Sequence, residues 1–529
     1  MRASRLFFVG SLFLLLMEWG GRVWASPDVM PQNLLTGSPL SINEGLEVLR
    51  SFGCASSMFT GDGIRTEDEI RRILAEAQDC NVAGDVAPLF QKTLAAFGAQ
   101  YPKSDEIDWK VLRFSRPVLQ GQYFYFKDDR RIIRPSDRID AVTSPWLSYR
   151  EGIPYAGGSN GRLAAAFGAS VGHWFDVSVA PAFLANQDDS GSVRLHAGVV
   201  KLTRGNFEVK AGRTVLLWGQ GHDGQVIASS NAPPLDLVEI GNPRPLMLPS
   251  FLRYAGPFQY RVIFSRLNQQ QAVPDPYFLN ARLMAKPTES LELALSRGIM
   301  FGGQGSPPYH WWWEPVSELL GIRIQEGFIF NIPIKPRGTG PLGFANNVTA
   351  LDARWRSAAL RGTEFFLEVY EEDPLDFQDF WPQDTIFHGG IWIPRLNAAG
   401  DWQLLVDGTR AADIVYSHLI YTSGYTQNGR LIGSDIGFDS REFRILLAKL
   451  FLPRVKVWGS FGMRFHMIPT QPLNPIEIRY LVQSGATYNV ANHWQVSLQG
   501  GLEQIENFNF VDGQEQTSFM SAVDLNYLF

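Results

Sequence analysis

The stretch Phe519-Met-Ser-Ala-Val-Asp-Leu-Asn-Tyr-Leu-Phe529 decides the fold class of this chain. Aromatic and branched side chains fall on one face of a period-two strand, and Asp524 and Asn526 fall on the other face. A strand of this kind suits a barrel wall with lipid outside and a polar lumen inside. The alternative, an amphipathic edge strand of a soluble protein, would leave an edge that soluble folds normally protect. We therefore interpret the chain as a transmembrane β-barrel.

The beginning of the sequence predicts export. Residues 1–25 contain Arg2 and Arg5, an apolar run over 6–17, and small residues just before Ser26, which is the pattern of a secretory signal peptide. The apolar run is too short to span a bilayer as a helix, and charges or prolines interrupt the later hydrophobic stretches. Only helices and closed barrels satisfy their own backbone groups in hydrocarbon. An exported membrane protein with these features is expected to be a β-barrel of the outer membrane.

The composition agrees with this interpretation. Of the 529 residues, 13% are aromatic and 19% are charged, and the net charge is -6. A negative net charge gives no basic face for nucleic acid, so we expect no nucleic-acid partner. The mean hydropathy of -0.09 is typical of barrels, whose strands average apolar with polar residues.

Residues 26–108 are predicted to form a helical bundle on the periplasmic side. The segments 41–44 and 66–69 both have capping-box spacing, in which a hydroxyl and a carboxylate satisfy free amides at a helix start. Apolar residues then recur at helical intervals, and the segment 86–100 repeats the pattern. We expect about three helices.

Both cysteines, Cys54 and Cys80, lie in this helical region. The periplasm is oxidising, so a disulfide between the ends of the first two helices is expected. Two buried free thiols are the alternative, because sequence does not supply the geometry of a bridge.

Residues 109–529 are predicted to form the barrel. Apolar and polar residues alternate in segments such as 193–199, 455–465 and 494–502. Such segments number about 18, which lies within the range of outer-membrane barrels. The predicted fold class is an all-β transmembrane antiparallel barrel of about 18 strands with an N-terminal periplasmic α-helical bundle.

Counting strands backwards from Phe529 assigns sides to the connections. Short links fall on the periplasmic side, and the long links are predicted outside, at 301–347, 372–400, 423–440 and 505–517. The count would place 214–256 on the periplasmic or lumen side. The stretch 231–249 contains five prolines, so it is predicted to be a plug in the lumen or across the periplasmic mouth and not a central strand.

Two motifs resemble a known family. The first is Gly212-Arg-Thr-Val-Leu-Leu-Trp218-Gly-Gln-Gly221, followed by Ile227-Ala-Ser-Ser-Asn-Ala-Pro233. The second is Tyr421-Thr-Ser-Gly-Tyr-Thr-Gln-Asn-Gly-Arg-Leu-Ile-Gly433. Together and in this order they resemble the signature regions of the Wzi-type capsule assembly proteins. The resemblance implies an outer-membrane barrel with a periplasmic helical bundle that acts as a surface lectin for capsular polysaccharide.

Two clusters in the predicted outer loops are candidates for polysaccharide binding. Indole faces pack against sugar rings, and carboxylates accept hydrogen bonds from sugar hydroxyls. The first cluster contains Trp311, Trp312, Trp313 and Glu314. Its alternative is an aromatic girdle at the bilayer interface or a packed loop. The second cluster contains Phe377, Phe380, Trp381, Asp384, His388 and Trp392, and its alternative is a folded loop that caps the barrel.

The glycine-rich segment 219–224 carries His222 and Asp223. It lacks the Lys and Ser/Thr of a phosphate loop and the ligand count of a metal site. We interpret it as a tight turn or lumen segment and expect no metal and no cofactor.

Three classes of function remain open. The first is a surface lectin or assembly factor that organises capsular or exopolysaccharide through many weak contacts. The second is a porin-like channel for small solutes or sugars, lined by lumen residues such as Arg354, Arg356, Lys456 and Arg464. The third is an outer-membrane enzyme, which we do not expect because no catalytic constellation is identifiable by spacing. Expected partners are polysaccharide, outer-membrane lipid and the barrel assembly machinery, whose recognition signal the terminal Phe529 resembles, and a monomer is expected.

Overall fold

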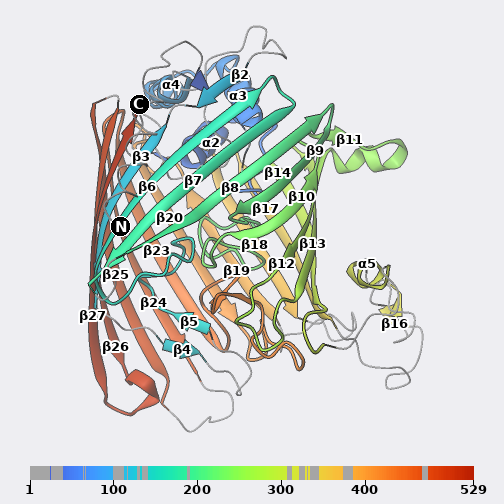
Figure 1. Ribbon diagram of the computed structural model, residues 1–529. Coiled ribbons are helices and arrows are strands. Elements are labelled where there is room, and N and C mark those ends of the chain that lie inside the picture. Colours follow the sequence, from blue (N-terminus) through green and yellow to red (C-terminus); the bar gives the residue numbers. More distant parts are fainter. Residues whose placement is uncertain are drawn as a thin grey trace, which may run out of the picture.

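The structure is a computed structural model of a barrel with a helical head at one mouth (Figure 1). The residues that it describes are 24–25, 40–63, 65, 67–98, 112–115, 117–127, 131–133, 141–187, 191–306, 313–320, 328–329, 332–333, 345–372, 385–467, 475–491 and 493–529.

Eighteen strands of the described chain form one closed antiparallel wall, which confirms the predicted fold class. The last strand pairs with the first, with Leu528 opposite Val118. The wall strands are β3 (Val118–Phe126), β6 (Gly158–Val171), β7 (Phe175–Asn186), β8 (Ser192–Arg204), β9 (Phe207–Thr214), β10 (Leu235–Gly241), β12 (Pro257–Arg266), β13 (Tyr277–Thr288), β14 (Leu291–Phe301), β17 (Asn346–Ser357), β18 (Thr363–Glu372), β19 (Thr385–Ile393), β20 (Trp402–Ala411), β23 (Ser440–Phe451), β24 (Val455–His466), β25 (Glu477–Ala491), β26 (Trp494–Glu506) and β27 (Glu515–Leu528).

The two faces of the wall differ as the alternation predicts. In β27, Phe519, Val523 and Leu525 are exposed on the outer face, whereas Asp524 and Asn526 are buried on the lumen face. Because the outer face is apolar and the lumen face packs against polar chain, a one-residue slip of register would reverse every side chain.

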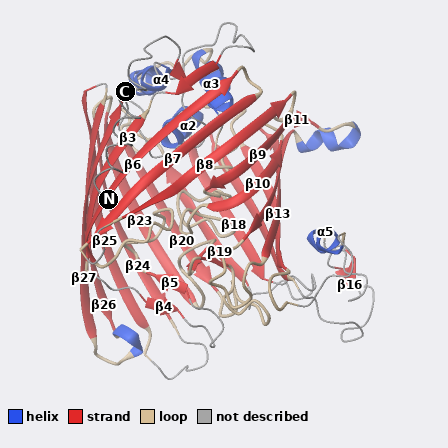
Figure 2. Ribbon diagram, viewed as in Figure 1, coloured by secondary structure: helices blue, strands red, loops and turns tan. Residues whose placement is uncertain are grey.

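Short elements accompany the wall, and Figure 2 distinguishes the helical ones from strands. They are β1 (Trp24–Ala25), β2 (Leu112–Ser115), β4 (Arg131–Ile133), β5 (Ala141–Thr143), β11 (Leu246–Met247), β15 (Phe328–Ile329), β16 (Ile332–Pro333), β21 (Thr426–Gln427), β22 (Arg430–Leu431), α5 (Glu314–Leu319), and the 3-10 helices η2 (Ser250–Ala255) and η4 (Phe508–Phe510).

The head contains the three expected helices, α2 (Ile42–Ser51), α3 (Glu67–Gln78) and α4 (Ala87–Gly98). The Ser41 hydroxyl accepts from the Glu44 backbone, and the Glu44 carboxylate accepts from the Ser41 backbone at 2.8 Å, which is the predicted capping box. The second predicted box begins at Thr66, which lies outside the described residues. Cys54 and Cys80 are joined by a disulfide with a Cα–Cα distance of 5.6 Å.

The predicted outer connection 372–400 is partly wrong, because it contains the wall strand β19. This strand pairs with β18 and β20, so residues 394–401 turn at the periplasmic mouth. Its lumen face carries Ile386 and Trp392, and Gly389 and Gly390 interrupt its centre. The polar-apolar contrast is therefore too weak to mark it as a strand.

The predicted plug 231–249 is also partly wrong. Residues 235–241 form β10, which is bonded to β9 on one side and β12 on the other. The prolines flank this strand and do not interrupt it, so every backbone N–H of the ladder remains available. The chain that enters the lumen is instead 215–234, and 242–256 is a periplasmic connection.

Among the described residues, no helix combines the length and apolar character needed to cross a membrane. The predicted signal peptide lies outside them except for Trp24 and Ala25, which pair in parallel with β2. Cleavage before Ser26 would remove that pairing, and the signal peptide stays a prediction.

Candidate functional site

Among the described residues, three inserted segments and the head fill the lumen of the barrel. The segment 215–234 enters between β9 and β10, the segment 412–439 folds inward between β20 and β23, and the segment 144–157 precedes β6. The head meets them from the periplasmic mouth (Figure 1).

The carboxylate of Glu368 on the wall binds three backbone groups of the segment 215–234. One oxygen of Glu368 in β18 accepts from the backbone N–H groups of Gln220 at 2.7 Å and Gly221 at 2.5 Å. The other oxygen accepts from the Val226 N–H at 2.9 Å. Charge-assisted hydrogen bonds of this kind are stronger than neutral ones. The predicted tight lumen segment 219–224 therefore lies in the lumen, bound to the wall.

The two motifs that resemble the capsule assembly family contact each other. The Ser229 backbone N–H donates to the Ile432 carbonyl at 2.8 Å, and its hydroxyl donates to the Gly433 carbonyl at 2.6 Å. The Asn231 amide donates to the Leu431 carbonyl at 2.9 Å. These bonds join 215–234 to 412–439, so the motifs form one packed layer across the lumen.

The head is held in the periplasmic mouth by buried ion pairs. Arg50 of α2 contacts Glu364 of β18 at 2.5 Å, and Arg261 of β12 contacts Asp62 at 3.0 Å. The backbone N–H groups of Thr60 and Gly61 donate to Glu292 of β14 at 2.9 and 2.8 Å. Glu364 also contacts Arg354, and Arg261 also lies 3.5 Å from Glu239, so these pairs belong to charge networks in which the loss of one member unbalances the others.

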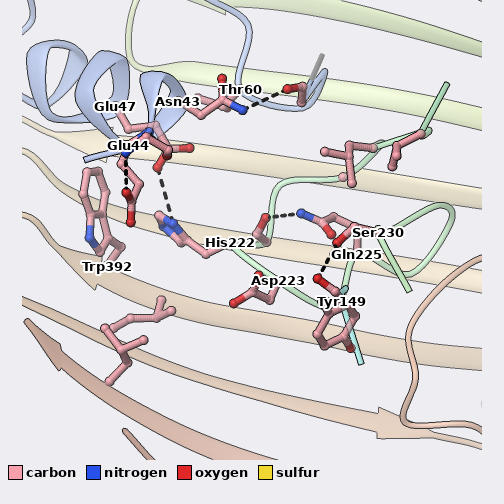
Figure 3. Close-up of a pocket in the computed structure, with 18 of the residues that line it drawn as sticks. Asn43, Glu44, Glu47, Thr60, Tyr149, His222, Asp223, Gln225, Ser230 and Trp392 are labelled. Atoms are coloured by element: carbon pink, nitrogen blue, oxygen red, sulfur yellow. Dashed lines mark hydrogen bonds and ion pairs between the residues drawn. The ribbon is translucent and has the colours of Figure 1, made fainter. Parts of the chain in front are cut away.

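A cavity of about 440 Å³ lies between the head, the segment 215–234 and the wall (Figure 3). Figure 3 shows Glu47 of α2 and His222 among the residues that line it, with their side chains pointing toward each other. The opposite wall contributes Lys456 and Trp458 of β24.

The charged groups around the cavity neutralise one another. Glu47 lies 3.3 Å from His222 and 3.4 Å from Arg354. Burial raises the pKa of the Glu47 carboxyl, but the charges of His222 and Arg354 outweigh it, so the pKa falls below its usual value.

A second cluster of ion pairs lies on the side of the cavity formed by β23 and β24. Arg444 of β23 contacts Asp407 at 2.6 Å and Asp223 at 3.2 Å, and Lys456 of β24 contacts Glu44. The cavity can therefore hold water or a small polar solute, and its cations Arg444 and Lys456 already have carboxylate partners. Of the four basic lumen residues expected from the sequence, Arg354, Lys456 and Arg464 form such pairs.

The structure separates the predicted polysaccharide-binding residues. Trp392 is not in an outer loop, because it lies on the lumen face of β19 with its ring centroid 5.1 Å from that of His222. His388 also lies on that face and is buried. Trp313 and Glu314 lie at the start of α5. The other predicted residues lie outside the described residues: Trp311, Trp312, Phe377, Phe380, Trp381 and Asp384.

Helix α5 lies against the outer face of the wall, near the outer end of β14. The Arg297 guanidinium, on the same face as Leu293 and Leu295, donates to the Glu318 carbonyl at 3.3 Å. Trp313 remains 48% exposed. This position agrees with either of the two alternatives for the tryptophan cluster, a binding loop or an interface girdle.

Sequence reasoning missed the lumen contacts of Glu368, His222, Arg444 and Glu47. For Glu368 and Arg444 the sequence did offer a signal, namely a charged residue at a lumen-facing position of a strand. His222 and Glu47 do not lie on strands, so this signal does not apply to them. Their partners are far away in the sequence, and periodicity does not identify partners.

A closed antiparallel wall with an apolar outer face and a charged, packed lumen defines an outer-membrane β-barrel. The family described as capsule assembly protein Wzi matches residues 130–519. Since this match covers most of the chain, the protein belongs to the Wzi family of capsule assembly proteins.

Two further comparisons agree. A Klebsiella pneumoniae protein described as an uncharacterized 55.8 kDa protein in the cps region is 26% identical over 271 residues, 45% of this chain and 51% of that protein. The chain thus spans about half the length of this curated relative. The solved structure of Escherichia coli Wzi, described as an outer membrane protein involved in group 1 capsule assembly and a carbohydrate binding β-barrel, matches with a TM-score of 0.68 at 16% identity. That match covers 96% of this chain and 100% of the other, and it shows the shared fold.

Proposed function

We propose that this protein binds capsular or extracellular polysaccharide at the cell surface and organises it there. Membership of the capsule assembly family supports this proposal, and so does the fold shared with a barrel described as carbohydrate binding. We further propose that it acts without catalysis, as a monomer inserted in outer-membrane lipid by the barrel assembly machinery.

The filled lumen is the observation that carries the proposal. A solute that crossed the barrel would have to displace the layer that joins 215–234 to 412–439, and then the ion-paired head. Each step would break buried, charge-assisted contacts. Binding at the outer loops requires none of this, because loops on a rigid scaffold are free to carry recognition residues.

We propose that the outer-loop residues Trp311, Trp312, Trp313 and Glu314 contribute to the binding surface, with Trp381 and Asp384 as a second set. Trp392 is left out of this proposal, because it faces the lumen. Exposed indoles favour stacking on sugar rings, and exposed apolar patches usually mark binding surfaces.

The test replaces Trp311, Trp312 and Trp313 together with Ala in cells that make their own surface polysaccharide. Cell-bound polymer should fall and free polymer should rise, while total synthesis stays constant. The matched control is Trp174→Ala at a periplasmic turn, because Trp174 is 47% exposed and so resembles Trp313. Normal retention in a well-assembled triple variant would remove this loop from the site and direct attention to Trp381 and Asp384.

The porin-like alternative has its own test. Planar-bilayer recordings of the intact protein should show at most small, brief openings, because the lumen is packed. Large and steady openings would contradict the binding proposal and support a channel for small solutes or sugars.

A further inference from the structure

The connection between β10 and β12 extends sideways from the barrel at the periplasmic mouth. It contains β11 and η2, and Figures 1 and 2 both show its short helix reaching away from the wall beside β11. It lies at the same end of the barrel as the head and the turn at Asn206, to which it is bonded. We call residues 242–256 the lateral arm.

Hydrogen bonds and backbone geometry hold the base of the lateral arm. The Asn206 amide donates to the Arg244 carbonyl at 2.9 Å, and the Arg244 N–H donates to the Asn206 side chain at 3.0 Å. The Asn242 amide donates to the Phe258 carbonyl at 3.2 Å. At the other end, Gly256 has a φ of 74°, and a Cβ there would lie 1.8 Å from the Lys286 carbonyl. Three prolines restrict the backbone between these points, so the arm is held in its projecting position by its own chain and contacts.

The lateral arm presents large apolar side chains to its surroundings. Phe251 and Tyr254 are each 73% exposed, Met247 is 61% exposed, and no residue of η2 is buried. Water contact of this extent is unfavourable, and contiguous exposed apolar groups usually mark an interaction surface.

The position of the lateral arm indicates what covers these side chains. The bonded turn at Asn206 is followed by Phe207, whose exposed ring lies on the periplasmic end of the wall. Trp174 and Trp494 are likewise exposed at periplasmic turns. Aromatic residues at this level of an outer-membrane barrel form the girdle at the membrane–water interface. The arm is thus continuous with the lipid-facing surface of the barrel.

The charge of the lateral arm is complementary to lipid headgroups. Arg244 and Arg253 are exposed, and residues 242–256 contain no Asp or Glu. The Arg253 guanidinium lies 5.2 Å from the centre of the Tyr254 ring, so an apolar ring and a cation share one surface. Interfacial segments commonly combine an apolar face with basic side chains that reach phosphate groups.

We propose that the lateral arm is an interfacial anchor that inserts Met247, Phe251, Leu252 and Tyr254 into the periplasmic leaflet and places Arg244 and Arg253 at its phosphates. The partner is a phospholipid surface that contains anionic headgroups. A second copy of the chain is the weaker candidate, because a symmetric contact between two arms would bring together two basic segments that carry no acidic residue.

The test uses the full-length protein with Phe251→Cys, labelled with an environment-sensitive fluorophore. Cys54 and Cys80 are disulfide-bonded, so only the new thiol reacts. In vesicles of phosphatidylethanolamine and phosphatidylglycerol, nitroxide-labelled lipid should remove roughly half of the emission, because interfacial segments lie within reach of the upper acyl chains. The control is Gln91→Cys on the exposed face of α4, whose label should respond to aqueous iodide and not to lipid nitroxide.

A second measurement tests the arginines. With Arg244→Gln and Arg253→Gln in the labelled protein, iodide access to position 251 should rise roughly two- to five-fold, since basic residues near an anionic leaflet each contribute modestly. Both substitutions are exposed, and heat-modifiability on gels verifies that the barrel has folded. A label at 251 that iodide quenches as strongly as the label at 91 would overturn the anchor. Protection from iodide that depends on the protein-to-lipid ratio would overturn it in favour of a second copy.

Discussion

The hydroxyl of Tyr416 donates a hydrogen bond to the carbonyl of Val226 at 2.6 Å and accepts one from the Ser434 backbone at 3.0 Å. The bond joins the segments 215–234 and 412–439, which are 190 residues apart at this contact. The Tyr416 hydroxyl thus adds to the bonds that Ser229 and Asn231 make between the two lumen segments.

Tyr416→Phe should loosen this layer while keeping its shape. The substitution leaves a buried carbonyl and a buried N–H unpaired, each at a cost of about 1–3 kcal/mol. Hydrogen exchange across 412–439 should become faster. Tyr425→Phe is the matched control, because its ring stacks on Tyr416 at 5.8 Å and the described residues supply no hydrogen-bond partner for its hydroxyl. Equal exchange in both variants would refute the role of the Tyr416 hydroxyl.

Glu368→Ala should loosen the attachment of the segment 215–234 to the wall, where the Gln220 side chain keeps its bonds to Glu292 and Asp352. Three backbone N–H groups lose their acceptor, and unpaired buried donors cost about 1–3 kcal/mol each. Planar-bilayer recordings should show more frequent and larger openings than those of the unchanged protein. Glu368→Gln should have a smaller effect, since one carbonyl acceptor remains. Leu367→Ala, on the outer face of the same strand, is the control and should behave as the unchanged protein does.

Replacing Cys54 and Cys80 with Ser should destabilise the head and leave the barrel assembled. The disulfide closes a separation of 26 residues, which corresponds to about 3–4 kcal/mol in the chain-entropy model. Limited proteolysis should cut 52–98 sooner in the double variant, and in reduced protein, than in the oxidised protein. Heat-modifiability of the barrel should not change. Equal protease resistance with and without reductant would show that the ion pairs of Arg50 and Asp62 hold the head by themselves.

Acidification should loosen the segment 412–439 through His418. Burial lowers the pKa of His418 to about 4, and its Nδ1 accepts from the backbone N–H groups of Ile420 and Tyr421 at 3.1 and 3.3 Å. In the unfolded segment the pKa of His418 is about 6.5, so as the pH falls the unfolded segment binds the proton before the folded one does. The stability that neutral, buried His418 contributes is therefore complete above about pH 6.5. It is lost as the pH falls toward 4.

Hydrogen exchange of 412–439 checks this prediction. It is measured between about pH 7.5 and about pH 4.5, which lie on either side of the pKa of an unfolded histidine. Exchange rates are corrected for their intrinsic pH dependence. His418→Asn keeps a side-chain acceptor without a proton to gain, so its corrected rates should vary less with pH. An identical pH dependence in this variant would assign the effect to another group.

The local pattern of the sequence determined most of the wall and the helices of the head. Alternation in Phe519–Phe529 separates a lipid face from a lumen face, because each side chain of a strand points opposite to its neighbour. The capping box at Ser41 and Glu44 likewise acts within one turn of helix. Both features depend on residues that are close together in the chain, so pattern alone was sufficient.

Tertiary structure decided what fills the barrel. The strand β10 carries Leu235 and Leu237 on its lumen face, and β19 carries Trp392 there, so neither shows clear alternation. Both are strands because their neighbours in the closed wall supply hydrogen-bond partners on each side. The pair Arg50–Glu364 joins residues 314 apart, and closure of the wall brings them together. Sequence periodicity determines which face a side chain occupies, but the partner it meets in the lumen depends on how the whole chain closes.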